Sequence, residues 1–556
     1  MSKEISERVN KYLTIRLRQI VYLLILFTSL ILLFYGIWQV RPIIVAVEAP
    51  LGLASYLHIA YWIGLALVVL VSVFAFLDQA LKKDALFILI LLTLGLFLLG
   101  IRVFVEENAL DADSYYPVSE VFNLLAVRHF DIANTSHIAR YYSWPAFHFI
   151  SATLLEVTGL KLITLMKYTP LYSILFFVLI TYGIGKRLSL PPNSCFLLGF
   201  LAISSWLIAF NGFYYPRLMA ATFFLLLFML LVLPDRTISR RITLLILFSA
   251  LVLTHGFVTV LVILGVLALS IYRKEINLVT VFIAIFAVWY MYQSYGGMET
   301  GIRALEKPLR DIFELARMER YETASPMGRL IARYSQLTYL LIYGTLIIGS
   351  IFLILRKKIT GKRRHQIIAL YVWIMGVGLT VAGSFGQDVT RTYAFSIVQL
   401  ACIVILSNFS KKLLIPVMCI FVILSPMVNY ASLAVFGQVT SSALSGARFF
   451  ALKVKPQESI FAVFNTKLPL FYDPDLIMVN TASYKYATKW MVGGDVSQID
   501  KYRYVVFNKL ASDELRFQFG KDQFLIWPQT VIGSKSDLIY NNGFLQIYEN
   551  HVLKQE

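Results

Sequence analysis

Long apolar runs are the feature that most constrains this chain. The first, Ile20 to Val40, approaches the about 20 apolar residues that a helix needs to cross a bilayer. Of the 556 residues, 58% are hydrophobic and 15% charged, against about 45–50% and about 25% in soluble domains. Because single cores stop growing near about 250–300 residues, the excess must face lipid. The sequence therefore predicts a polytopic α-helical membrane protein and excludes soluble, disordered and disulfide-stapled secreted classes.

Thirteen segments are predicted to span the membrane. Their boundaries follow from the apolar length that one crossing requires. They are 19–40, 55–77, 85–103, 163–186, 194–211, 217–234, 242–255, 257–272, 276–293, 336–355, 366–384, 393–408 and 412–430. The pair that meets at Thr254-His255-Gly256 is open to two interpretations, because each half is short: two short spans, or one long tilted helix across 242–272.

The distribution of Lys and Arg predicts the orientation. Alternate short connections, starting with the N-terminal tail 1–18, carry 22 of these cations, and the opposite ones carry three: Arg41, Arg217 and Arg391. Since basic residues concentrate on the cytoplasmic side, the N-terminus is expected in the cytoplasm and, after thirteen crossings, the C-terminus outside. Most of the +18 net charge is thus explained by membrane topology, which argues against a nucleic-acid partner.

Three larger segments are predicted on the outer face. Two of them, 104–162 and 294–335, interrupt the transmembrane domain 19–430, and the third is the tail 431–556. The tail alternates turn residues with short β-branched or aromatic runs, which predicts a small extracytoplasmic α/β domain. Its strands are expected at 459–464, 476–479, 504–507, 524–526 and 544–548, with a helix at 481–491.

The first outer segment is the most informative one. Glu106, Glu107, Asp111 and Asp113 directly follow the third span. Two amphipathic stretches, 118–130 and 145–159, are then expected to lie on the membrane surface, as is 302–318 in the second outer segment. A carboxylate held there could accept a proton from an attacking hydroxyl. Spacing alone does not distinguish this catalytic role from a simpler interpretation, in which the acidic residues are merely solvated at a helix end.

The order of these pieces resembles the GT-C membrane glycosyltransferases. This family includes protein O-mannosyltransferases, the aminoarabinose transferase of lipid A, and oligosaccharyltransferase catalytic subunits. The resemblance rests on an outer loop opening Asp111-Ala-Asp113-Ser-Tyr-Tyr, then Tyr141-Tyr142-Ser-Trp-Pro145, and a surface helix closing at Thr158-Gly159. The Asp-x-Tyr-Tyr opening, the Thr-His-Gly turn and the ending Ile539–Tyr548 look most like archaeal members.

The resemblance implies an activity and its partners. A sugar would pass from a polyprenyl- or dolichyl-phosphate donor to a glycan, lipid or protein acceptor on the extracytoplasmic face. The acidic catalytic residue of such enzymes maps onto Asp113 or Asp111, and we favour Asp113 because Tyr115 and Tyr116 follow it closely. The second outer loop, 211–217, lacks the acidic residue that many members carry. The sequence assigns no cofactor, and it leaves the need for a divalent cation open.

Several polar residues are candidates for substrate binding. A positioned cation would stabilise the phosphate leaving group, bidentately if it is Arg. A simple Asp388–Arg391 ion pair or contacts to bulk lipid headgroups would also explain some of them, and His255 could be merely structural. The candidates are Arg217, Arg329, Arg333, Arg391, Asp388, His255, Glu107, Tyr115 and Tyr116.

Two other functions compete with the glycosyltransferase. A glycan polymerase or ligase would take a lipid-diphosphate-linked oligosaccharide at the same face, with outer-loop Arg or His instead of an early Asp. A lipid or glycan transporter should carry charges in mid-span and paired broken helices. The spans here are nearly free of charge in their middles, which disfavours transport.

Overall fold

The chain is analysed as a computed structural model. It describes 2–45, 49–81, 83–108, 114–115, 118, 121, 124–125, 128, 144–205, 216–232, 237–274, 276–293, 326–382, 389–431, 439–453, 460–463, 502–508, 536–542 and 545–550. The predicted helices 118–130, 302–318 and 481–491 and the predicted strands 476–479 and 524–526 lie wholly or mostly outside these residues.

Every predicted span overlaps a helix, although the ends of 194–211, 217–234 and 366–384 lie outside the described residues. The third is nearly continuous through α3 (Asp84–Gly95), η2 (Leu96–Gly100) and α4 (Ile101–Val105). The other helices are α1 (Ser2–Val40), α2 (Ile59–Leu77), α8 (Leu162–Arg187), α9 (Pro192–Ser204), α10 (Pro216–Leu231), α11 (Ile238–Thr254), α12 (Gly256–Arg273), α13 (Asn277–Gln293), α15 (Pro326–Leu355), α16 (Gly361–Ala382), α17 (Val389–Leu406) and α18 (Lys411–Ala431).

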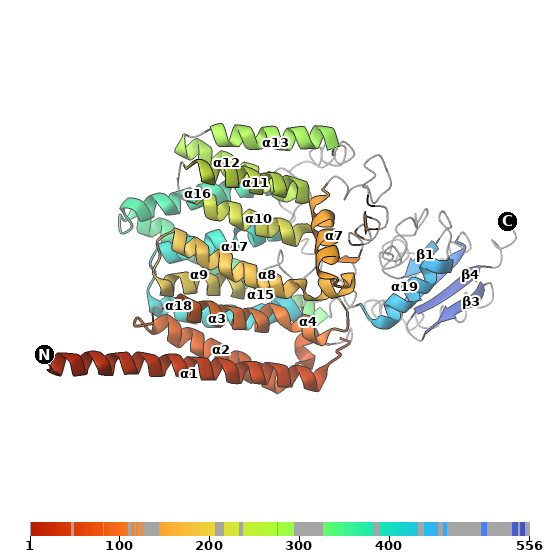
Figure 1. Ribbon diagram of the computed structural model, residues 1–556, viewed down its shortest axis with the longest axis horizontal. Coiled ribbons are helices and arrows are strands. Elements are labelled where there is room, and N and C mark those ends of the chain that lie inside the picture. Colours follow the sequence, from red (N-terminus) through yellow and green to blue (C-terminus); the bar gives the residue numbers. More distant parts are fainter. Residues whose placement is uncertain are drawn as a thin grey trace.

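The helices form one bundle with two distinct ends. Figure 1 shows them side by side, with the N-terminus at one end and α7 (Ala146–Thr158) and the tail at the other. Within the described part of the chain, seven helices are long and apolar enough to cross a membrane, and five more apolar helices are shorter. On α1, Leu33 is fully buried while its neighbour Phe34 and Trp38 are exposed. This division into a packed face and an exposed apolar face is that of a multi-pass membrane protein.

The third span contains a π-helical turn with a structural consequence. This turn, η2, shifts the hydrogen bonds of the helix. The Phe97 carbonyl in it accepts hydrogen bonds from Tyr61 of α2 and Tyr430 of α18, each at 2.8 Å. An irregular turn therefore joins the third span to the preceding helix, α2, and to the distant α18.

The helices α11 and α12 are separate, which answers the question that the sequence left open for 242–272. His255 has extended backbone angles, φ −165° and ψ 110°, so the helical path breaks there. Its amide still donates to Leu251 and its carbonyl accepts from the Thr259 amide, which keeps both helix ends hydrogen-bonded.

The tail contains a helix and a four-stranded sheet in its described part. The helix is α19 (Ser441–Lys453), and the strand order is β1-β2-β4-β3, with only the β1–β2 pair parallel. The predictions at 459–464, 504–507 and 544–548 are confirmed, whereas α19 and β3 were not predicted. The strands are β1 (Ile460–Val463), β2 (Tyr504–Asn508), β3 (Ser536–Asn541) and β4 (Leu545–Asn550).

A second hydrophobic core joins this tail to the bundle. The first core lies within the bundle itself. The second combines the first outer loop, α7, the start of α8, α19 and the strands β2 and β4. At its centre α19 packs so closely on β4 that any side chain at Gly446 would overlap Leu545. The loop predicted to carry the chemistry is therefore packed against the tail.

Candidate functional site

The first outer loop begins at the end of α4, at the end of the bundle that carries α7 and the tail (Figure 1). Helix α7 confirms the surface helix predicted at 145–159, and it ends at Gly159, whose left-handed φ of 65° suits glycine. In Figure 1 it runs across the ends of the spanning helices. Of the predicted site residues, Asp111, Asp113, Tyr116 and Asp388 lie outside the described residues, as do the side chains of Arg329 and Arg391.

A buried ion pair stands at the start of this loop. Arg102 Nε lies 2.5 Å from Glu106 Oε1, and both side chains are 5% exposed. The other carboxylate oxygen, Oε2, is buried without a hydrogen-bond partner among the described residues. Burial raises the pKa of Glu106, and Arg102 opposes that rise only in part.

Glu107 connects three parts of the molecule. Its carboxylate accepts hydrogen bonds from the backbone amide of Ser441 at 2.8 Å and from the Ser441 hydroxyl at 2.5 Å. Its backbone carbonyl accepts from Lys167 Nζ of α8 at 3.0 Å. A carboxylate at a helix N-terminus satisfies free amides and complements the helix dipole. Glu107 thus caps the N-terminus of α19, a role that its sequence position did not reveal.

Tyr115 is enclosed in the second hydrophobic core. Its side chain is fully buried, as are those of Ser114 and Val118. The core that surrounds it includes Phe147 of α7 and Leu444 of α19. The structure therefore places Tyr115 at the packed base of the loop.

His255 is brought to the same end of the bundle as the first loop. Trp144, which precedes α7, lies directly against Gly256, since a Cβ there would be 2.7 Å from the indole Cζ2. Helix α11 also contacts α7. His148 of α7 is buried with its ring edge-on to Phe147. The Thr-His-Gly turn thus lies at the end of the bundle where the first loop begins. The glycine in this turn allows the Trp144 indole to approach the backbone closely.

An apolar cavity of about 490 Å³ lies between α7, α8 and α10. Thr169, Ser173 and Thr222 line it, but each donates its hydroxyl to a backbone carbonyl of its own helix. The exposed wall therefore stays apolar. The larger side chains around it are Phe147, Leu160, Tyr172, Phe176, Met219 and Phe223.

Two of the predicted cations can be placed. Arg217 stands in the first turn of α10, half-buried, and the next residue, Leu218, lines the apolar cavity. Arg333 is exposed on α15. Among the described residues, no group of three His, Cys, Asp or Glu side chains could hold a metal ion. Asp111 and Asp113 lie outside that part of the chain, so the need for a divalent cation stays open, as the sequence left it.

No protein-family model matches the sequence, and neither does any curated protein. Solved structures do match. An oligosaccharyltransferase of Archaeoglobus fulgidus, in complex with Zn and sulfate, aligns with 84% of this chain and 73% of its own, at 13% identity and a TM-score of 0.50. The A. fulgidus oligosaccharyltransferase AglB with an inhibitory peptide and a dolichol-phosphate covers 84% and 74% at 10% identity and 0.47. ArnT of Cupriavidus metallidurans with undecaprenyl phosphate covers 84% and 97% at 13% and 0.44.

At such low identity a structural match describes the fold and not the activity. The first of these structures matches this chain over most of both chains. The architecture expected from the resemblance is therefore confirmed, and the chain has the fold of that oligosaccharyltransferase.

Proposed function

We propose that this protein is a membrane glycosyltransferase. It moves a sugar from a polyprenyl- or dolichyl-phosphate donor to a glycan, lipid or protein acceptor. The reaction takes place at the end of the bundle that carries α7, on the extracytoplasmic face. The fold of an oligosaccharyltransferase supports the class of enzyme, and the apolar cavity supports the class of donor.

The cavity is the observation that carries this proposal. Its walls are mostly aliphatic and aromatic, and the hydroxyl groups of Thr169, Ser173 and Thr222 bond to their own helices. Tyr172 and Phe176, on the cavity wall, are exposed on the surface of α8. An isoprenoid chain can reach such a cavity from the lipid and lose its contact with water and headgroups there. This wall offers a soluble nucleotide-sugar donor few polar partners, the Tyr172 hydroxyl among them.

Chemistry is assigned to the loop beside the cavity. Asp113, with Asp111 as the alternative, acts as the base that accepts the proton of the attacking group. Arg217, at the start of α10, stabilises the negative charge that grows on the carrier phosphate. Arg391, beside Asp388, is the second candidate for that role.

The remaining assignments concern binding. We assign Arg329 and Arg333 of α15 to the donor headgroup and Tyr116 to substrate binding, and His255 contributes from the turn against Trp144. Tyr115 and Glu107 position the loop and do not themselves contact substrate. Tyr115 is packed in the second core, and Glu107 caps the N-terminus of α19.

The topology proposed for the enzyme keeps all thirteen crossings. Residues 1–18 are cytoplasmic, 19–430 form the transmembrane domain with outer segments 104–162 and 294–335, and 431–556 form an extracytoplasmic domain. Because the tail packs on the catalytic loop through the second core, it is well placed to contact the acceptor.

The test is sugar transfer by the full chain reconstituted in liposomes. Radiolabelled polyprenyl- and dolichyl-phosphate sugars are supplied with membrane extract as the source of acceptors. Asp113→Asn should lower the rate about a hundredfold or more, the typical contribution of a general base, without a change in thermal unfolding. Asp111→Asn, assayed in parallel, identifies which aspartate accepts the proton.

The matched control is Asp84→Asn, which removes a carboxylate at the other end of the bundle, where Asp84 pairs with Lys186 at 2.7 Å. It should keep its transfer rate. Full activity in both loop variants would remove the base from the mechanism. Transfer only from lipid-diphosphate-linked oligosaccharides would replace this proposal with a polymerase or ligase.

A further inference from the structure

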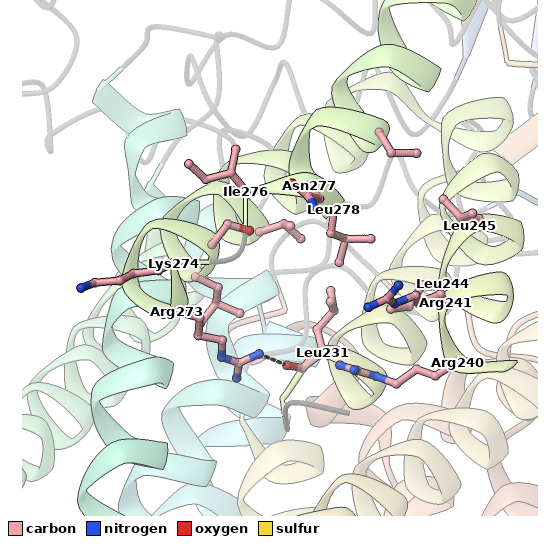
Figure 2. Close-up of a pocket in the computed structure, with 14 residues that line it drawn as sticks. Leu231, Arg240, Arg241, Leu244, Leu245, Arg273, Lys274, Ile276, Asn277 and Leu278 are labelled. Carbon is pink, nitrogen blue, oxygen red and sulfur yellow. Dashed lines mark hydrogen bonds between the residues drawn. The ribbon is translucent and has the colours of Figure 1, made fainter. Parts of the chain in front are cut away.

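A second cavity lies at the opposite end of the bundle. It has a volume of about 500 Å³ and lies where α10 ends, α11 begins, α12 ends and α13 begins. Four cations line it, and none of its fourteen lining residues is acidic: Arg240, Arg241, Arg273 and Lys274. Figure 2 shows the guanidinium groups of Arg240 and Arg273 directed toward Leu231, with Arg241 nearby and Lys274 turned away at the rim. This cavity has no part in the proposed transfer reaction.

Two of the four cations hold the end of α10. Arg273 donates to the carbonyl of Leu231 at 3.0 Å and to that of Val232 at 3.1 Å. Arg240 donates from Nε to the carbonyl of Leu230 at 2.8 Å. The last carbonyls of a helix have no partner within it, so these contacts are C-terminal caps. They also fix two guanidinium groups at the cavity wall.

Arg241 has no such task. The side chain makes no hydrogen bond or ion pair to a described residue, and it is exposed in the first turn of α11. A cation there meets the positive end of the helix dipole, which is unfavourable unless an anion lies nearby. Asp235 and Glu275, close in sequence to these cations, lie outside the described residues.

Apart from Ser270 and Asn277, the rest of the cavity wall is apolar. Leu244 and Leu245 of α11, Val266 and Leu269 of α12, and Leu278 of α13 line it. Phosphate alone would need only the cations. A ligand that uses both kinds of wall carries a charged group and hydrocarbon on the same molecule, as membrane lipids do.

Topology alone does not explain the arrangement. Basic residues gather at the cytoplasmic ends of spans and set the orientation. That rule governs which side of the membrane they occupy, and exposed cations such as Arg363 on α16 satisfy it without lining this cavity. Basic pockets between transmembrane helices on the cytoplasmic side are known to bind anionic headgroups.

We propose that this cavity binds an anionic membrane lipid of the inner leaflet. Its phosphate lies between Arg241 and the two capping guanidinium groups of Arg240 and Arg273. Its hydrocarbon runs along the leucines of α11 and α13. By joining the ends of four helices, the bound lipid stabilises this corner of the bundle.

The experiment is a titration of the full-length protein in a neutral detergent with three probes. Dioctanoyl phosphatidic acid carries both charge and chains, dioctanoyl phosphatidylcholine carries chains with no net charge, and inorganic phosphate carries charge alone. Native mass spectrometry counts bound lipid, and the thermal unfolding midpoint reports stabilisation. Only the anionic lipid should bind saturably and raise the midpoint.

Two variants test the two walls separately. Arg241→Gln should weaken the anionic lipid about fivefold, the worth of roughly one cation at a membrane surface, while leaving the ligand-free midpoint unchanged. Leu278→Trp should weaken it with every cation kept. Arg363→Gln, on α16 and away from the cavity, is the matched control and should bind as the wild type does.

Three results would overturn the proposal. Equal binding of phosphatidylcholine would show that the cavity does not recognise the negative charge of the headgroup. Saturable stabilisation by inorganic phosphate would make the site one for a soluble anion. Equal losses in Arg241→Gln and Arg363→Gln would show a diffuse surface effect.

Discussion

At the scale of single residues, the Arg102–Glu106 pair is the most demanding feature near the proposed active site. Both side chains are almost fully buried, and only one oxygen of Glu106 receives a hydrogen bond from a described residue. Taking two charges out of water costs several kcal/mol per ion unless geometry and further hydrogen bonds compensate. The pair therefore stabilises the loop only as long as both partners are present.

Arg102→Met should destabilise the protein strongly, by about 3–5 kcal/mol, because it leaves a buried carboxylate without its partner. The double variant Arg102→Met with Glu106→Gln should regain much of that loss, since neither charge remains. Chemical unfolding of the purified protein in detergent measures both. Additive effects of the two single substitutions would show that the residues do not interact.

The pH dependence of this pair has a defined sign. Burial raises the pKa of Glu106 in the folded protein. The stability that the protonated form contributes is therefore complete below the unfolded-state pKa and is lost as the pH rises through the folded-state pKa. Glu106→Gln should remove this part of the pH dependence of the unfolding midpoint. An unchanged profile would contradict the assignment.

At the scale of elements, the packing of α7 against α8 and α10 decides which donor the proposed enzyme can hold. Helix α7 lies across the bundle end and closes one side of the apolar cavity. Threonines and a serine keep this space open because larger side chains would fill it. Hydroxyls bonded to their own helices are compatible with lipid contact.

Thr222→Phe should place a ring in the cavity and raise the KM for the lipid donor roughly tenfold, or about 1.4 kcal/mol of binding, with little change in kcat. The control is Thr345→Phe, an exposed threonine on α15 whose hydroxyl also bonds its own helix. Donor kinetics in liposomes compare the two. Equal kinetics for both variants would place the donor elsewhere.

At the scale of the whole molecule, the two ends of the bundle differ in chemistry. One carries the surface helix, the first loop and the tail, and the other carries the N-terminus and the cationic cavity (Figure 1). This polarity along the membrane normal is what a donor carried in one leaflet requires. The proposed orientation follows from where the basic residues lie.

Single cysteines test that orientation in a background without Cys195, Cys402 and Cys419. Leu538→Cys lies on β3, where the side chain is 48% exposed, and Lys362→Cys is exposed at the start of α16. A membrane-impermeant maleimide should label the first in intact cells and the second only after permeabilisation. The reverse pattern would place the proposed active site in the cytoplasm.

How far the sequence predicts this architecture depends on the range of the forces involved. Each predicted span overlaps a helix, and seven of the described helices are long and apolar enough to cross a membrane, because apolar length is a local property. The break at His255 needed the structure, since a short polar turn is compatible with either interpretation. Strands β1, β2 and β4 were predicted from local composition, whereas β3 carries a mixed pattern with Asp537 and Asn541.

The candidate site is harder to predict from the sequence, because it depends on contacts between residues that are distant in the chain. The role of Glu107 in starting α19 depends on a contact between residues 334 positions apart, and no local pattern encodes it. The apolar cavity likewise exists only once three helices meet. Asp111 and Asp113 rest on the resemblance of their loop to GT-C enzymes, and they stay predictions that the transfer assay addresses.

The bond between Glu107 and Ser441 bears on how the protein is made. Ser441 emerges from the ribosome long after Glu107, when every spanning helix between them has already been synthesised. The N-terminus of α19 can therefore be capped only once α18 has been inserted and the first outer loop lies on the same side of the membrane. Correct biogenesis of the membrane part becomes a condition for maturation of the tail, so a chain with a misinserted helix would display an undocked tail to the quality-control proteases.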